Sequence, residues 1–131
     1  MSTKKLFITT ALLEAGAGAA FLAFPSTTLI LLLSVPLETA ACVTLGRLTG
    51  LALLSLGIAN WQARNDAQSR AARGIITAML IYNLGAVIIL ATAAITSHSS
   101  GPLLWPGAIL HAAMTIWCVL SLLNKSSTPK T

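Results

Sequence analysis

The sequence predicts an all-α fold, a bundle of four transmembrane helices with a short interfacial helix after the first span. The 131 residues are 56% hydrophobic and only 8% charged, whereas a soluble domain carries about 25% charged residues. Four apolar stretches are each long enough to cross a hydrocarbon core of about 30 Å. We therefore expect residues 1–131 to form a single integral membrane domain.

The first span is predicted over residues 6–24, and Pro25 ends it because proline lacks the N–H that a helix interior needs. Ser26 is a suitable N-cap for a short helix over about residues 26–34. That segment is too short to cross a bilayer, so we expect it to be interfacial or re-entrant. Glu14 interrupts the apolar run, which favours a retained span over a cleaved signal peptide.

The other three spans are predicted over residues 40–61, 74–96 and 105–123. A polar segment at residues 64–70 precedes the third span, and residues 97–102 form a loop because they are rich in Ser, Gly and Pro. Trp105 favours a membrane interface, and Pro106 is tolerated in a first helical turn. The fourth span is therefore expected to begin there.

Most basic residues are predicted to lie on one side of the bundle. Seven of the eight flank that side: Lys4, Lys5, Arg64, Arg70, Arg73, Lys125 and Lys130. An excess of Lys and Arg marks the cytoplasmic side. We therefore expect both termini in the cytoplasm, with Glu38 and His98 on the far side. Because these cations alternate with apolar stretches, they indicate contact with membrane lipids and no nucleic-acid binding.

Each predicted span places polar groups near the middle of the bilayer. These residues are Glu14, Arg47, Tyr82, Asn83 and His111. A charge at that depth costs about 2.5–3.5 kcal/mol on insertion scales, so it should face the bundle interior and mark a functional site. We expect the five residues to form an intramembrane polar cluster, which either binds a ligand or contains an ion pair.

Glu14 and Arg47 carry opposite charges inside their spans. At a rise of 1.5 Å per residue, Glu14 lies about 12 Å from the cytoplasmic side and Arg47 about 10 Å from the opposite side. Their depths differ by about 8 Å, a gap that extended side chains on adjacent helices can largely close. One interpretation is an ion pair that fixes helix register. The alternatives are a site for a substrate, lipid headgroup or proton, and a contact with another subunit.

The remaining polar groups indicate packing more than chemistry. Tyr82 and Asn83 are interpreted as interhelical hydrogen-bonding groups. His111 is either a core histidine with hydrogen-bonding partners or a ligand of haem or chlorophyll; we expect no cofactor. Cys42 and Cys118 show no metal-ligand spacing. Their depths differ by about 15–20 Å, beyond the ~7 Å Cα limit of a disulfide, so both should be free and no metal site is expected.

Three glycines, Gly46, Gly50 and Gly57, form a stripe of small residues in the second span. Small residues let membrane helices approach one another closely, and G-x-x-x-G is a known packing motif. We therefore expect this stripe, which lies beside Arg47, to pack against a neighbouring helix.

Four short motifs stand out: Leu13-Glu14-Ala15-Gly16, Pro25 at the end of the first span, Gly46-Arg47-Leu48-Thr49-Gly50, and Trp105-Pro106 with His111. Together they resemble a group of small bacterial four-helix inner-membrane proteins near the DoxX-like families. The resemblance implies a four-helix bundle in the bacterial inner membrane. It implies little about activity.

No catalytic constellation or phosphate-binding loop is found in the sequence, so we expect no enzymatic activity. The leading hypothesis is a structural, accessory, or small-ligand- or lipid-binding membrane protein, with a homo-oligomer or a larger membrane complex as its possible assembly. The alternative is a proton-coupled small-molecule transporter that uses Glu14. Small multidrug transporters resemble the chain in length, in four spans and in a glutamate within the first helix. Their inverted dimers do not fit its one-sided Lys and Arg.

Overall fold

The computed structural model describes residues 2–36, 39–96 and 101–124. Within these ranges the chain is helical: α1 (Thr3–Ala23), α2 (Pro25–Leu33), α3 (Ala40–Ala63), α4 (Arg70–Thr96) and α5 (Leu104–Leu123). All except α2 are long and apolar enough to cross a membrane. The predicted all-α fold, with four candidate spans and a short helix after the first, is confirmed. Glu38 and His98, which concern the predicted topology, lie outside the described residues.

The junction between α1 and α2 differs from the prediction by two residues. Pro25 is the first residue of α2, where its missing N–H leaves no helical hydrogen bond unmade. Phe24 is therefore the N-cap of α2, and Ser26, predicted as the cap, lies inside the helix. The helix ends at Leu33, and its C-cap residue Ser34 adopts a left-handed conformation with φ of 57°.

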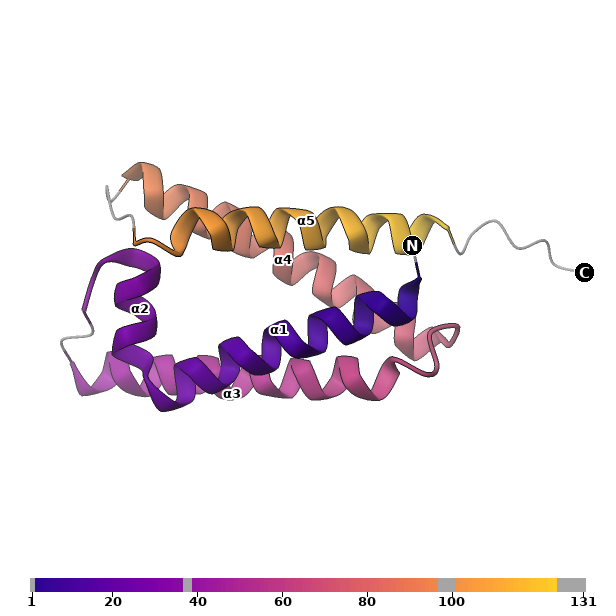
Figure 1. Cartoon of the computed structure of the whole chain (residues 1–131), viewed down its shortest axis with the longest axis horizontal. Helices are drawn as coiled ribbons and strands as arrows, with labels where there is room; N and C mark the ends of the chain where they lie inside the picture. The colour runs from indigo at the N-terminus through magenta and orange to yellow at the C-terminus, as the bar shows by residue number, and fades with distance from the viewer. Residues whose placement is uncertain (1, 37–38, 97–100, 125–131) are drawn as a thin grey trace, which may run out of the picture.

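Helix α1 packs lengthwise against α3 (Figure 1). A methyl group added to Gly18 would lie 2.7 Å from a backbone nitrogen of α3, and one added to Gly50 would lie 2.7 Å from a backbone nitrogen of α1. The two backbones therefore touch at these glycines. Gly57 lies against α1 two turns further along, where an added methyl would be 3.0 Å from the backbone. Gly46, one turn before Gly50, is half-buried.

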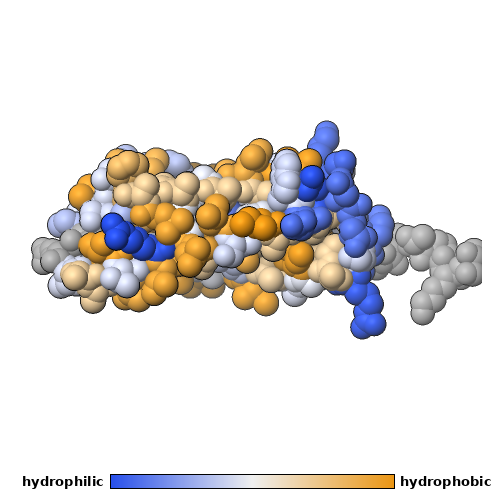
Figure 2. Space-filling model, turned by 90° about the horizontal axis from the view of Figure 1, so that it is seen from below, coloured by the Kyte–Doolittle hydropathy of each residue, from blue (hydrophilic) through white to orange (hydrophobic). Residues whose placement is uncertain are grey.

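Helices α4 and α5 form a second pair, and the two pairs meet in a core at one end of the bundle. The core takes side chains from the start of α1, the first half of α4 and the second half of α5: Leu6, Phe7, Ala72, Ile76, Met79, Met114 and Cys118. The α3–α4 connection and the beginning of α1 lie at this same end (Figure 1). Hydrophilic residues also gather there, whereas most of the remaining surface in view is apolar (Figure 2).

Helix α2 runs across the opposite end of the bundle, between the α1–α3 pair and α5 (Figure 1). The backbone N–H of Leu103, just before α5, donates a hydrogen bond of 2.9 Å to the carbonyl of Leu31. Gly101 lies so close to the backbone of Leu31 that a side chain on it would overlap the carbonyl group. The short helix is thus attached to the beginning of α5 by direct backbone contact.

Both cysteines are free, as the sequence predicts. Cys42 is exposed in the first turn of α3, at the α2 end of the bundle. Cys118 is buried in the core at the other end. The two thiols therefore lie at opposite ends of the bundle, too far apart to form a disulfide.

Candidate functional site

A cavity of about 840 Å³ lies between the two helix pairs, and all five helices contribute to its wall. Most lining residues are apolar. The polar ones are Thr10, Glu14, Thr28, Thr49, Tyr82, Asn83 and His111. The cavity therefore collects four of the five residues predicted to form the intramembrane cluster.

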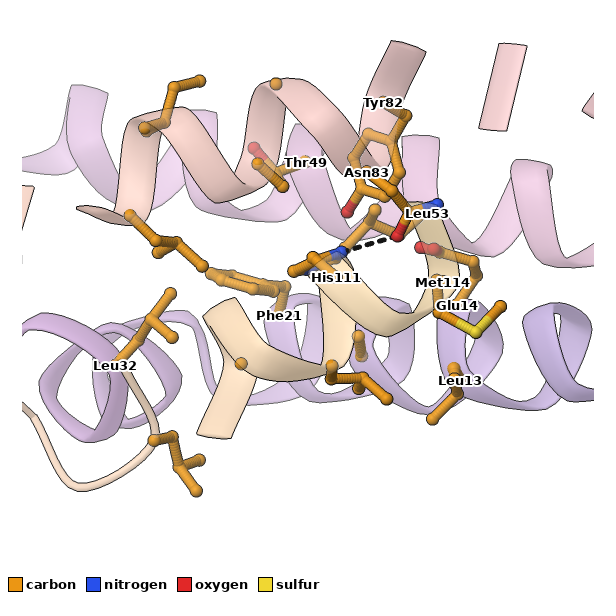
Figure 3. A pocket seen from close by; sticks show the side chains of 18 of the residues that line it. Leu13, Glu14, Phe21, Leu32, Thr49, Leu53, Tyr82, Asn83, His111 and Met114 are labelled. Carbon is orange, nitrogen blue, oxygen red and sulfur yellow. Dashed lines mark hydrogen bonds between the residues drawn. The ribbon is translucent and has the colours of Figure 1, made fainter. Parts of the chain in front are cut away.

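The polar groups are concentrated at one end of the cavity, which we call the floor: Glu14, Tyr82, Asn83 and His111 (Figure 3). The floor rests on the core that joins the helix pairs, since Met114 belongs to both. Phe21 and Leu90 line the other end, seven residues beyond Glu14 and Asn83 on their helices, which corresponds to about 10 Å. This apolar end lies beside Leu32 of α2. The cavity is therefore most polar at the bundle's middle, and towards α2 its wall is apolar except for Thr28 and Thr49, whose hydroxyls donate to their own backbone.

Glu14 lies at the floor, and none of the described residues pairs with its charge. Its residue surface is only 6% exposed, and its carboxyl group points towards the amide of Asn83 (Figure 3). Within residues 2–36, 39–96 and 101–124, no ion pair or hydrogen bond to this carboxyl group is found. Thr10, one turn earlier on the same face of α1, is also buried and lines the cavity. A carboxyl group here is available to a proton or to a ligand.

Arg47 does not join the cluster. Its side chain is exposed on α3 and is not part of the cavity wall. Gly57 packs against Ala11 and Ala15, so Glu14 is level with Gly57. Gly57 lies ten residues beyond Arg47, which places the two charges about 15 Å apart along the helix axis, twice the predicted gap. In the described structure Arg47 is exposed and Glu14 is unpaired, so the ion-pair interpretation is not supported.

Asn83 and His111 connect α4 to α5 at the floor through a hydrogen bond of 2.8 Å between Asn83 Oδ1 and His111 Nδ1. The amide orientation is fixed because Asn83 Nδ2 donates to the carbonyl of Met79 at 2.7 Å. Oδ1 therefore faces the ring, and a carbonyl oxygen can only accept. Consequently Nδ1 of His111 carries the proton and donates. In a neutral imidazole the other nitrogen, Nε2, is then an acceptor.

Tyr82 also contacts the His111 ring. The two rings meet edge to face, with centroids 5.6 Å apart and planes inclined by 82°. Such edge-on contacts are favoured between aromatic rings. His111 is thus positioned by a hydrogen bond from its Nδ1 to Asn83 and by a ring contact with Tyr82.

The cavity also uses residues that the polar-cluster prediction did not include, notably Thr10, Thr49 and Phe21. Threonines in membrane helices commonly bond to their own backbone, as Thr49 does to Leu45, and so give no distinctive signal in sequence. Conversely, a buried polar residue need not line the cavity. Asn60 is buried like Asn83 and makes the same bond to a backbone carbonyl four residues earlier, at 2.9 Å, but it lies outside the cavity wall.

Metal-ligating side chains do not gather in the part of the chain that the structure describes: no group of three or more His, Cys, Asp or Glu residues occurs there. At the floor, Glu14 and His111 are the two side chains of these types that line the cavity. The arrangement suits hydrogen bonding or charge pairing to an organic molecule better than a metal centre, which needs a fuller ligand set.

Comparison with known proteins gives no assignment of function. No protein-family model, curated protein or solved structure matches this chain. The resemblance to the DoxX-like neighbourhood therefore stays a prediction.

Proposed function

We propose that this protein binds a small lipophilic molecule inside the membrane. The observation that carries the proposal is the cavity of about 840 Å³, apolar over most of its wall and polar at its floor. Ligand pockets generally measure about 300–1,000 Å³ and combine an apolar lining with a few convergent polar groups. Glu14, Asn83 and His111 provide those groups here.

Lateral access from the lipid supports a lipophilic ligand. Ile81 and Ile89 of α4 line the cavity and are 68% and 69% exposed. Thr49 of α3 also lines it and is exposed. The cavity wall between α3 and α4 is therefore continuous with the surface that lipid would cover. A molecule dissolved in the bilayer could reach the floor without crossing water.

Filling the cavity is expected to reduce ligand retention without unfolding the protein. Gly85 lines the cavity, and an added methyl would meet nothing within 4 Å. Leucine at this position should compete with the ligand for space, weakening binding by about 5- to 150-fold if the overlap costs about 1–3 kcal/mol. The measurement is mass spectrometry of lipophilic molecules that co-purify with Gly85→Leu and wild type from native membranes.

Gly74→Leu is the matched control, because Gly74 is also a helical glycine with nothing within 4 Å but lies outside the cavity wall. Equal amounts of the same retained molecule in all three proteins would contradict the proposal. A stoichiometric protein partner with no retained molecule would favour the accessory role instead.

The proposed setting is the bacterial inner membrane, with both termini in the cytoplasm and membrane lipids as partners. The concentration of hydrophilic residues at one end of the molecule supports the orientation (Figure 2). Exposed large apolar side chains on all five helices support lipid contact, or contact with further subunits in a homo-oligomer or larger complex.

A second candidate, proton-coupled transport of the ligand, is favoured by one observation: Glu14 faces the cavity and has no cationic partner among the described residues. Under this candidate, flux in liposomes depends on pH. Glu14→Gln should abolish the pH-dependent flux because an amide cannot exchange the proton. Arg47→Leu should retain it, since Arg47 is outside the cavity wall. Equal flux in wild type and Glu14→Gln would eliminate this candidate.

A further inference from the structure

The His111 ring presents a hydrogen-bond acceptor to the cavity. The chain from the Met79 carbonyl through Asn83 places the ring proton on Nδ1. Nε2 is then the free acceptor, and within the described residues no hydrogen bond to it is found. Because His111 lines the cavity, this lone pair is available to a bound molecule.

The other residues of the floor do not make it richer in hydrogen-bond donors than in acceptors. An ionised Glu14 carboxylate only accepts hydrogen bonds, and Tyr82 can either accept or donate. Asn83 donates one of its two amide hydrogens to Met79, accepts the His111 hydrogen at its oxygen, and keeps one amide hydrogen as a donor. The floor therefore has more to offer a donor than an acceptor.

From this juxtaposition we infer that the cavity selects a lipophilic molecule bearing a hydroxyl group, which donates a hydrogen bond to His111 Nε2 while the apolar part extends towards Phe21 and Leu32. The inference rests on the proposed function and specifies its ligand class. A hydroxyl group supplies this donor as a neutral group and so does not carry the desolvation cost of an ion. Asn83 acts as a positioning residue, since it sets which ring nitrogen accepts.

The test compares 1-decanol with decyl methyl ether, which has the same chain but no hydroxyl hydrogen. The protein is reconstituted in lipid nanodiscs with ¹⁵N-labelled histidine, and each probe is titrated as its mole fraction in the bilayer. The chain has two histidines, so His98→Gln assigns the signals. We expect the free protein to show an Nδ1-protonated His111 ring. Decanol should shift its Nε2 signal and bind about three- to tenfold more tightly than the ether.

Asn83→Leu removes the group that fixes the ring and should erase the preference for the alcohol. Asn60→Leu is the matched control, because it removes an equally buried asparagine with the same backbone bond outside the cavity wall. It should leave the preference unchanged. Loss of the preference in both variants would mean that stability, not ring orientation, is being measured, and would overturn the role given to Asn83.

The outcomes separate this inference from the function beneath it. If alcohol and ether bind equally, or if Nε2 carries a proton in the free protein, the hydroxyl inference is wrong and the binding function stands. If neither probe binds, and Gly85→Leu retains as much native material as wild type, both are wrong.

Discussion

Gly18→Ala is expected to lower the free energy of unfolding by about 1–3 kcal/mol, because the added methyl would overlap the backbone of α3. At Gly18 the methyl would lie 2.7 Å from the Leu54 nitrogen and 2.8 Å from the Gly50 oxygen. Backbone atoms in a helix cannot rotate aside as a side chain can. The helices would have to separate, which would weaken the α1–α3 contact along its length.

Gly16→Ala is the control for this change and should have the opposite sign. Gly16 lies one half-turn away on the same helix, and a methyl there meets nothing within 4 Å. Alanine is favoured over glycine in helices by about 1 kcal/mol, so stability should stay the same or rise. Equilibrium unfolding in mixed micelles, followed by circular dichroism, measures both variants. Equal effects of the two substitutions would show that α1 and α3 do not touch at Gly18.

Phe7→Ala is expected to destabilise the protein by up to about 3 kcal/mol, the low end of the range for removing a fully buried phenylalanine from a water-soluble core. Phe7 is 0% exposed and lies in the core that joins the two helix pairs. In a membrane the loss is one of van der Waals contacts more than of hydrophobic burial, because lipid is as apolar as the core. The same unfolding measurement reports the change.

Phe24→Ala provides the comparison, since Phe24 is 67% exposed at the junction of α1 and α2. Its loss should change stability by less than about 0.5 kcal/mol, as is usual for surface positions. A Phe7→Ala protein as stable as Phe24→Ala would indicate that the pairs are held together elsewhere.

The fold could be predicted from the sequence because each span is a continuous apolar stretch between polar or proline-containing segments. Helix α4 begins at Arg70, four residues before the predicted span, because a polar first turn can project from the apolar layer and still be helical. The cap of α2 was missed because Ser26 has a good capping side chain, yet Pro25 fits the first helical turn better.

The candidate site was harder to predict, because depth along a span does not give register between spans. The estimate for Glu14 and Arg47 treated both helices as starting at a membrane surface. Their actual offset is set by the contact of Gly18 with Gly50, which brings Glu14 level with Gly57. The bond between Asn83 and His111 depends likewise on how α4 packs against α5. Polar residues in spans identified the cluster, but only packing shows which members meet.

The division into two helix pairs has a consequence for the size of molecule that can be held. Within the α1–α3 pair the backbones are in contact at Gly18 and Gly50, so the spacing of this pair cannot change without breaking that contact. The pairs are joined by the core around Phe7 at one end, and at the other α2 is attached to α5 through Leu103. A bulkier guest would be accommodated by release of the backbone contact between Leu31 and Leu103, which would let the pairs rock apart about that core, as in hinge motions of domains. The floor, close to the core, would keep its spacing while the apolar end widened. The cavity would then be selective for the polar head of a bound molecule and would accept apolar tails of different sizes.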